Sequence, residues 1–220
     1  MRIFAAESRN NCKKTLPGAM RIVDEIESKI NESEAGSLFF VTDFATGGND
    51  VFISRLLSEL AEQGLMCRLA KGIYYKPMMT KFGVLMPDVK ELVKAIARRD
   101  KAQVLPTGET AANMLGLSTQ VPLNYVYLTS GSARKIMVGK KTVTFKRCVP
   151  KNFACQSMFL AVLIQAMKAI GQERLTDEHC VIIKGLLMKN LPIESLDVDM
   201  KNAPLWVRHM VYNIIKEIDV

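Results

Sequence analysis

The sequence predicts an α+β protein, because amphipathic helical segments alternate with short strand-like runs over most of its 220 residues. Hydrophobic residues make up 49% of the chain, which is enough to bury a sizeable core. Residues 152–220 show helical periodicity alone. We therefore expect one domain at 1–80 and a second at 81–220, with an α/β part at 81–151 and a helical part at 152–220.

The first 80 residues contain a basic arm followed by an ordered series of helices and strands. After the arm, apolar residues recur at helical spacing, and a strand-like run follows at 37–41. We expect Thr42-Asp43 to cap a short helix, a longer helix over 49–63, and a β-hairpin over 65–76. This order is that of a winged helix-turn-helix, whose third helix enters the major groove of DNA while the hairpin lies against the backbone. The arm carries Arg2, Arg9, Lys13 and Lys14.

Polar and basic side chains lie off the apolar face of the longer helix and along the hairpin, where base edges and phosphates are within reach. No Asp or Glu occurs between 65 and 81, and we expect the hydroxyls of Tyr74 and Tyr75 to donate to phosphate. Two alternatives are that Arg55 pairs with Glu59 on the helix surface and that the winged helix contacts only protein. The candidate DNA contacts are Asn49, Ser54, Arg55, Ser58, Arg68, Lys71 and Lys76.

Positive charge is concentrated in the first two thirds of the chain. Residues 1–151 contain 23 Lys and Arg against 14 Asp and Glu, whereas residues 152–220 contain 7 against 8. A basic segment suits a polyanion, and nucleic acid is the commonest one; ordinary solubility charge is the alternative.

A second group of basic residues, from 134 to 151, has no acidic residue among its members. Strands are expected at 125–129, 135–138 and 142–146, and in the last of these Val143 and Phe145 alternate with polar residues, so the basic side faces solvent. We expect this surface to bind DNA phosphates or an acidic partner; the alternative is an edge strand that lysines protect from aggregation. Its members are Arg134, Lys135, Lys140, Lys141, Lys146 and Arg147, with Lys151 beyond them.

Helix boundaries are also predicted in the second domain. Asp88 and Glu91 have the spacing of a capping box at the start of a helix that ends near residue 99. Thr107 is expected to cap a helix over 108–115. Two further helices are expected within 153–190 and a last one over 204–218.

No pattern in the sequence indicates catalysis, a cofactor or a metal. His179 and His209 are expected in helices, the former as a helix-start residue rather than a partner of Cys180. Asp197 and Asp199 lack a third ligand and are expected in an acidic linker. Phosphate-binding loops, dinucleotide fingerprints and nucleophile elbows are absent from the sequence, so we expect a protein without enzymatic activity.

Cysteine usage and hydropathy bear on the compartment. The five cysteines are odd in number and scattered, which favours free thiols in a reduced, cytoplasmic protein. No apolar run approaches the length of a membrane span, and residues 1–16 do not resemble a signal peptide.

Four segments of the sequence resemble a known family. They are LAEQG at 60–64, RLAKGIYY at 68–75, PTGETAA at 106–112 and LGLSTQVP at 115–122. On these segments the chain from Phe39 to Arg147 resembles the AbiE-type antitoxins of type IV toxin–antitoxin systems.

This resemblance implies an antitoxin, not itself an enzyme, that represses its own operon through an N-terminal winged helix. It also implies a C-terminal domain that counteracts a partner toxin with a nucleotidyltransferase fold. The family's recognition helix corresponds to 49–63, and the basic residues of its wing to Arg68 and Lys71. An ordinary winged-helix transcriptional regulator and a protein–protein adaptor without DNA binding remain alternatives, and the oligomeric state stays open.

Overall fold

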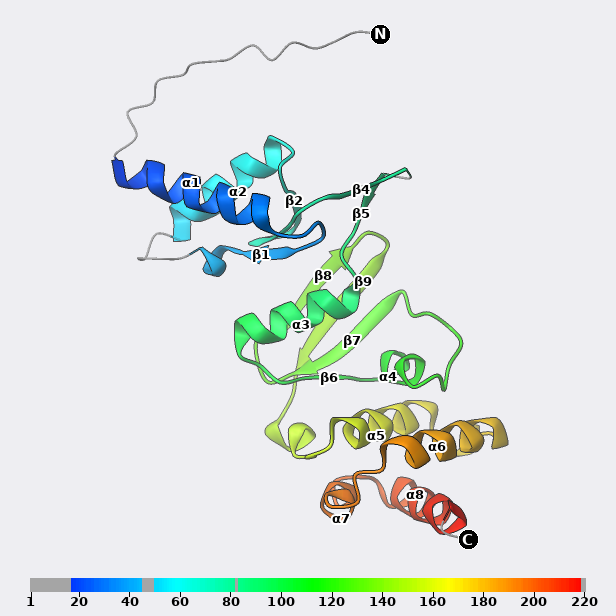
Figure 1. The fold of residues 1–220 in the computed structure, drawn as a ribbon. Coiled ribbons are helices and arrows are strands. Elements are labelled where there is room, and N and C mark those ends of the chain that lie inside the picture. Colours follow the sequence, from blue (N-terminus) through cyan, green and yellow to red (C-terminus); the bar gives the residue numbers. More distant parts are fainter. Residues whose placement is uncertain (1–16, 45–49, 82, 219–220) are drawn as a thin grey trace.

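The computed structural model describes residues 17–44, 50–81 and 83–218. Within these ranges the chain is a mixed α+β protein with eight α-helices and three sheets, so the predicted fold class is confirmed at this level. A three-stranded sheet with two helices forms one end of the molecule, a four-stranded sheet the middle, and the C-terminal helices the other end (Figure 1).

The N-terminal unit has helices and strands at most of the predicted positions, but Thr42 and Asp43 lie within a 3-10 helix instead of capping a helix that follows them, and residues 45–49, where that helix was expected, lie outside the described residues. Its helices are α1 (Pro17–Glu32), the short 3-10 helix η1 (Val41–Asp43) and α2 (Asp50–Glu62), and its strands are β1 (Leu38–Phe40), β2 (Cys67–Ala70) and β3 (Ile73–Tyr75). The strands pair antiparallel in the order β1-β3-β2, which places β3 in the centre. Apolar residues of α1 and α2 meet one face of this sheet, with Leu57, Leu60 and Tyr74 almost fully buried there.

A second hairpin, which the sequence analysis did not predict, follows directly on β3. It consists of β4 (Met78–Thr80) and β5 (Gly83–Leu85), paired antiparallel as a separate two-stranded sheet. Pro77 precedes it and Pro87 follows it. β3, the second strand of the predicted hairpin, ends before Pro77, and the additional hairpin begins directly after this proline.

The middle of the molecule is a four-stranded sheet covered on one face by α3 (Val89–Asp100). The strands are β6 (Val104–Pro106), β7 (Asn124–Thr129), β8 (Arg134–Val138) and β9 (Lys141–Arg147), in the order β6-β7-β9-β8. β7 and β9 run parallel, whereas β8 pairs antiparallel with β9 and forms an edge of the sheet. The short helix α4 (Glu109–Met114) connects β6 to β7.

Helices make up the C-terminal part. A 3-10 helix η2 (Pro150–Phe153) leads into α5 (Met158–Ile170), and η3 (Gln172–Arg174), α6 (Asp177–Asn190), α7 (Leu196–Met200) and α8 (Leu205–Ile218) follow. Leu160, Leu163 and Met167 of α5 are buried between the sheet region and the last helices. No helix within the described ranges is both long and apolar enough to span a bilayer.

The buried clusters cross the expected domain boundaries. Phe40 and Ile73, from the N-terminal sheet, are buried with α3 and the strands β7 to β9. Leu105 and Leu117 likewise belong to the cluster of the C-terminal helices. Neither residue 80 nor residue 151 therefore separates two independent cores.

Three further expected capping or linker roles were wrong. The Asp88 side chain makes no capping hydrogen bond, so α3 begins without the predicted capping box. Gly108 rather than Thr107 occupies the N-cap of α4, and the Thr107 hydroxyl donates to Gln165 Oε1 at 3.1 Å. Asp199 lies fully buried in α7 rather than in an exposed linker.

Candidate nucleic-acid interface

Helix α2 has one buried and one exposed face, as its apolar spacing predicts. Ile53, Leu56 and Leu57 point into the N-terminal core, whereas Arg55 is exposed and Ser54 partly so. Arg55 Nε donates to Glu59 Oε1 at 3.0 Å, which is the i,i+4 pair considered above. An exposed pair of this kind contributes only about 0.3–0.5 kcal/mol and opens readily for another anion.

A groove of about 640 Å³ lies between the exposed face of α2 and the turn that joins β2 to β3. The turn is Lys71-Gly72, and Gly72 has a positive φ of 70°, a conformation that glycine adopts without strain. The Lys71 side chain is exposed at the rim. Four of the predicted contacts, Ser54, Arg55, Ser58 and Lys71, therefore border one concave surface, whose lining is Val41, Asp50, Val51, Ser54, Arg55, Ser58, Lys71 and Gly72.

Two predicted contacts have partners inside the protein instead. The Ser58 hydroxyl lies 2.8 Å from the Ser54 carbonyl, to which it donates, and 3.0 Å from the Tyr74 hydroxyl. Lys76 Nζ donates to the carbonyls of Asn31 at 2.9 Å and Ser33 at 2.8 Å, so it fixes the end of α1 to β3. Their main role is thus to hold α2 and α1 against the sheet.

The predicted phosphate contacts from Tyr74 and Tyr75 are wrong, because both side chains are buried. β3 is the central strand, and the helices cover one of its faces while α3 and the middle sheet cover the other. Burial, followed by a hydrogen bond to Cys67, raises the pKa of Tyr75 to about 12. Arg68, which lies opposite Tyr74 in the strand register, is exposed and can contact a phosphate. Asn49 and the basic arm lie outside the described residues.

The strands β8 and β9 distribute the second basic group over two faces. Lys135 and Lys146 lie with Thr142 and Thr144 on the face away from α3, which is open to solvent at this edge. Lys140 is exposed in the turn. The prediction that Lys146 faces outward is confirmed.

The expectation of one continuous basic surface needs correction at the other positions, which lie on the α3 side. Arg134 pairs with Asp100 of α3 and lies over the Phe145 ring, 6.0 Å from its centroid. Lys141 Nζ lies 5.8 Å from the centroid of the Tyr125 ring. Arg147, in phase with Lys141 along β9, is exposed near the end of the strand. Arg134 is in phase with the apolar Ile136 and Val138, a signal that could have shown its inward position.

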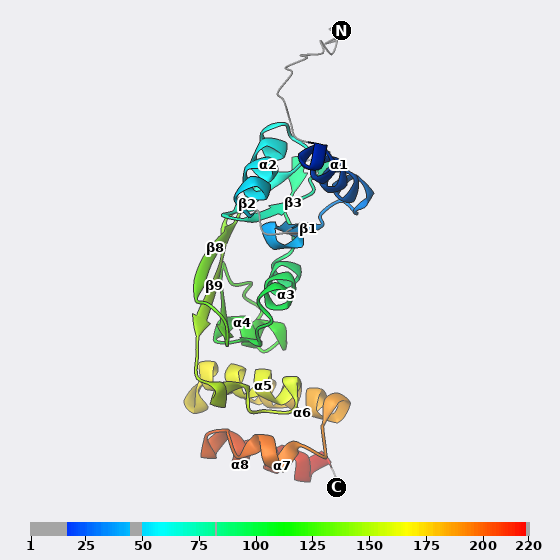
Figure 2. The same ribbon diagram turned by 90° about the vertical axis from the view of Figure 1, so that its left-hand side faces the viewer.

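The two basic regions lie on the same side of the molecule. Figure 2 shows α2, β2, β8 and β9 along one side, with α1 and α3 on the opposite side. Strand β2 lies directly beside β8. The β2–β3 hairpin, which carries Arg68 and Lys71, is therefore followed along the same side by β8 and β9, which carry Lys135 and Lys146.

Candidate catalytic and metal-binding residues have structural partners. His179 Nδ1 accepts from the Thr176 backbone N–H at 3.1 Å, and Nε2 lies 3.0 Å from the Leu117 carbonyl, which agrees with the expected helix-start role. Asp199 accepts from the Gln156 and Ser157 backbone N–H groups at 2.7 and 2.9 Å. No group of three or more His, Cys, Asp or Glu within the described ranges could hold a metal ion.

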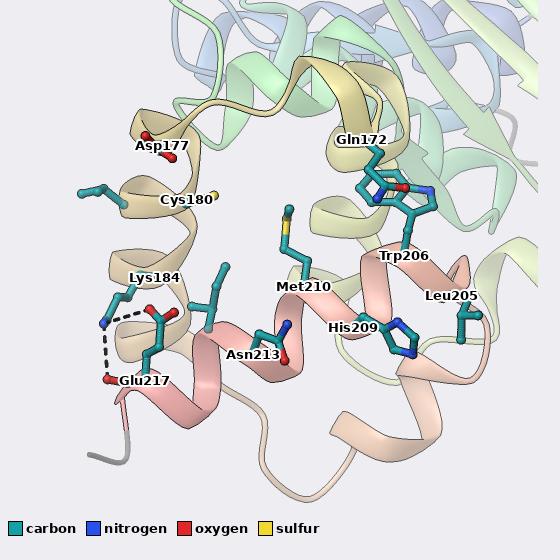
Figure 3. A pocket seen from close by; sticks show the side chains of 12 residues that line it. Gln172, Asp177, Cys180, Lys184, Leu205, Trp206, His209, Met210, Asn213 and Glu217 are labelled. Carbon is teal, nitrogen blue, oxygen red and sulfur yellow. Dashed lines mark hydrogen bonds and ion pairs between the residues drawn. The ribbon is translucent and has the colours of Figure 1, made fainter.

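A larger groove of about 880 Å³ lies between α6 and α8 (Figure 3). Trp206, Met210 and Val181 supply apolar surface. At one end Lys184 Nζ lies 3.5 Å from Glu217 Oε2. Both helices were predicted from the sequence, but the groove between them was not.

Together, the fold and these surfaces define a mixed α+β protein with a basic hairpin beside an exposed polar helix face. The chain belongs to a family of unknown function, DUF6088, which matches residues 25–195. No curated protein matches the chain.

Proposed function

We propose that this chain binds double-stranded DNA, with residues 17–80 acting as a winged helix. The order of helices and strands and the sheet order β1-β3-β2 support this proposal. The observation that carries it is the groove between α2 and the Lys71-Gly72 turn, since a polar helix face and a basic hairpin border the same hollow. α2 would enter the major groove, and the hairpin would lie against the phosphate backbone.

The side chains have different roles in this proposal. Arg55 and Ser54 would face base edges, because they lie on the exposed side of α2 next to the groove. Arg68 and Lys71 would contact phosphates, which position the protein without reading sequence. Lys135 and Lys146 would extend the phosphate contacts along the duplex, because their strands β8 and β9 lie on the same side of the molecule as α2 and β2.

The cellular role that we propose is that of an antitoxin that represses its own operon. The resemblance of residues 39–147 to AbiE-type antitoxins supports it. A further point in favour is the groove between α6 and α8, because exposed apolar side chains there are typical of a protein-binding surface. The partner would be a toxin with a nucleotidyltransferase fold, as in the family that the sequence resembles.

The proposal is tested by titrating the full chain with promoter DNA of its own operon at several salt concentrations. If about four phosphates are contacted, log K against log salt should have a slope near −3 to −4. Changing Arg68 and Lys71 to Ala together should weaken binding to all sequences alike and make the slope shallower by about 2.

The matched control is Lys189→Ala with Lys201→Ala, two exposed lysines in the C-terminal part. It changes the net charge equally and should leave binding unchanged. Absence of binding at low salt would exclude DNA binding and favour the adaptor alternative. If the chain binds the promoter but does not protect cells that express a neighbouring toxin gene, it would instead be an ordinary transcriptional regulator.

A further inference from the structure

A small polar pocket of about 280 Å³ lies in the C-terminal part of the protein, where three segments of the chain meet. The segments are η2 with the residues that follow it, helix α5, and the residues that follow α7. No Asp or Glu lines the pocket. Its polar lining residues are Lys151, Asn152, Gln165, Lys168 and Asn202.

The hydrogen-bond donors of this lining are not used inside the protein. Within the described ranges, the ammonium groups of Lys151 and Lys168 have no hydrogen-bond or ion-pair partner, and the side-chain amides of Asn152 and Asn202 make no hydrogen bond. The Gln165 side chain bonds only through its Oε1, so its NH₂ group has no partner there either. Two cations and three amides therefore surround one concave space without a counterion.

The carboxylate of Asp199, three positions before Asn202 in the chain, does not supply that counterion. It is fully buried, and its oxygens accept from two backbone N–H groups and from the Ser195 hydroxyl. Lys168 lies in the last turn of α5, where a cation also stabilises the helix dipole. The dipole accounts for Lys168 alone and leaves Lys151 and the amides unexplained.

A second pocket, of about 430 Å³ and lined largely by apolar residues, borders the same face of α5. Met158, Ala161, Gln165 and Lys168 follow one another at spacings of three and four residues, so they share this face. Met158 and Ala161 line the apolar pocket, whereas Ala161, Gln165 and Lys168 line the polar one. A ligand that lay along this face would thus meet apolar surface at one end and positive charge at the other.

We propose that this face of α5 binds a small organic phosphate monoester, with the phosphate near Lys151 and Lys168 and the apolar body toward Met158. A phosphate monoester carries a charge of about −1.5 to −2 at pH 7 and three strong acceptor oxygens, which match two ammonium groups and several amide donors. A carboxylate would leave one of the two cations unpaired. The polar pocket is smaller than the roughly 300–1,000 Å³ typical of whole-ligand sites, so it suits the phosphate group alone.

The test is isothermal titration calorimetry of the full chain with phenyl phosphate, at low ionic strength and in a buffer without phosphate. Phenyl phosphate should bind one site per chain and at least about tenfold more tightly than inorganic phosphate, because its ring buries apolar surface. Lys151→Gln with Lys168→Gln should weaken binding by about tenfold for each lysine. The control Lys189→Gln with Lys216→Gln removes the same charge from two exposed lysines outside both pockets and should bind as the wild type does.

Asn202→Asp decides the case in which the double lysine variant fails to fold. It places a carboxylate of nearly the same size at an exposed position in the lining, so phenyl phosphate should be repelled while the melting temperature stays unchanged. Absence of phenyl phosphate binding by the wild type up to about 10 mM, a level well above a weak dissociation constant of about 1 mM, would overturn the proposal. An unchanged affinity in either folded variant, or equal affinity of the wild type for inorganic phosphate, would overturn it too.

The lysines could instead contact the phosphates of a DNA duplex, and the same variants exclude or establish this. A double lysine variant with a shallower salt slope of DNA binding, together with no phenyl phosphate binding by the wild type, would assign Lys151 and Lys168 to DNA and overturn the proposed ligand. Because the calorimetry contains no DNA, failure of this proposal is distinguishable from a failure of DNA binding.

Discussion

Reversing the charge of the open sheet face should separate DNA contact from protein stability. The change is Lys135→Glu with Lys146→Glu, two exposed side chains on the face of β8 and β9 that α3 does not cover. Their side chains make no contribution to the buried cluster beneath α3. We therefore expect the free energy of unfolding to change by no more than about 0.5 kcal/mol at each position.

The effect on DNA binding can be estimated from the two phosphate contacts that would be lost. Each contact contributes about 0.9 to the slope of log K against log salt, so the slope should become shallower by about 1.8. Between 50 and 200 mM salt, this difference amounts to about tenfold in affinity, with the larger deficit at low salt. The slope thus isolates the charge effect from any general loss of binding.

The assay is fluorescence anisotropy with labelled promoter DNA at four or more salt concentrations. The matched control is Lys90→Glu with Arg98→Glu, two exposed residues of α3 on the opposite side of the molecule. Both variants change the net charge by the same amount, so a non-specific effect of total charge would appear equally in each. Identical slopes for the two variants would refute the assignment of the sheet face to DNA.

Three further predictions concern groups inside the protein. Asp199→Ala should lower the unfolding free energy, measured in urea, by about 3–5 kcal/mol, because removal of the buried carboxylate leaves two backbone N–H groups and the Ser195 hydroxyl without their acceptor. A loss below about 1 kcal/mol would contradict this role. Lys76→Ala should cost about 1 kcal/mol through the lost bonds to Asn31 and Ser33 while leaving the salt slope of DNA binding unchanged, and a shallower slope would instead make it a phosphate contact. Burial, and next the neighbouring Tyr125, raises the pKa of Tyr127 to about 12, above its unfolded value near 10. The contribution of Tyr127 to the unfolding free energy is therefore present below pH 10 and is lost as pH rises toward 12. In urea melts, the unfolding free energy of Tyr127→Phe should fall less steeply over this pH range than that of the wild type, and an equally steep fall would contradict the raised pKa.

Local patterns predicted the elements well where one face is buried and the other exposed. α2 is the best case, because its apolar spacing alone separates Leu56 and Leu57 from Arg55. The hairpin β2–β3 was equally accessible, since glycine at 72 matches the positive φ of its turn. The strands of the middle sheet were also predicted, but their order and the parallel pairing of β7 with β9 depend on contacts between distant residues.

Side-chain roles were less predictable where both faces of an element are covered. Tyr74 and Lys76 lie on or beside a central strand, and periodicity cannot show that helices occupy one side and a second sheet the other. Asp199 receives two backbone hydrogen bonds, from Gln156 and Ser157, that come from more than forty positions away, so the local sequence does not identify it as buried. The candidate site was therefore predicted in its exposed members, Arg55, Arg68 and Lys71.

The burial of Phe40 and Ile73 beneath α3 limits how this protein can be rearranged by recombination. A fusion that transferred only residues 1–80 to another protein would expose both side chains, at a cost of about 2–3 kcal/mol each. The guanidinium of Arg99, which lies 4.6 Å from the centroid of the Phe40 ring, would also be lost. The smallest portable unit is consequently longer than the DNA-binding elements and must include α3 and the four-stranded sheet. A break after residue 147 would have the same consequence for Leu105 and Leu117, which are buried with the C-terminal helices, so exchange of parts is disfavoured at both boundaries.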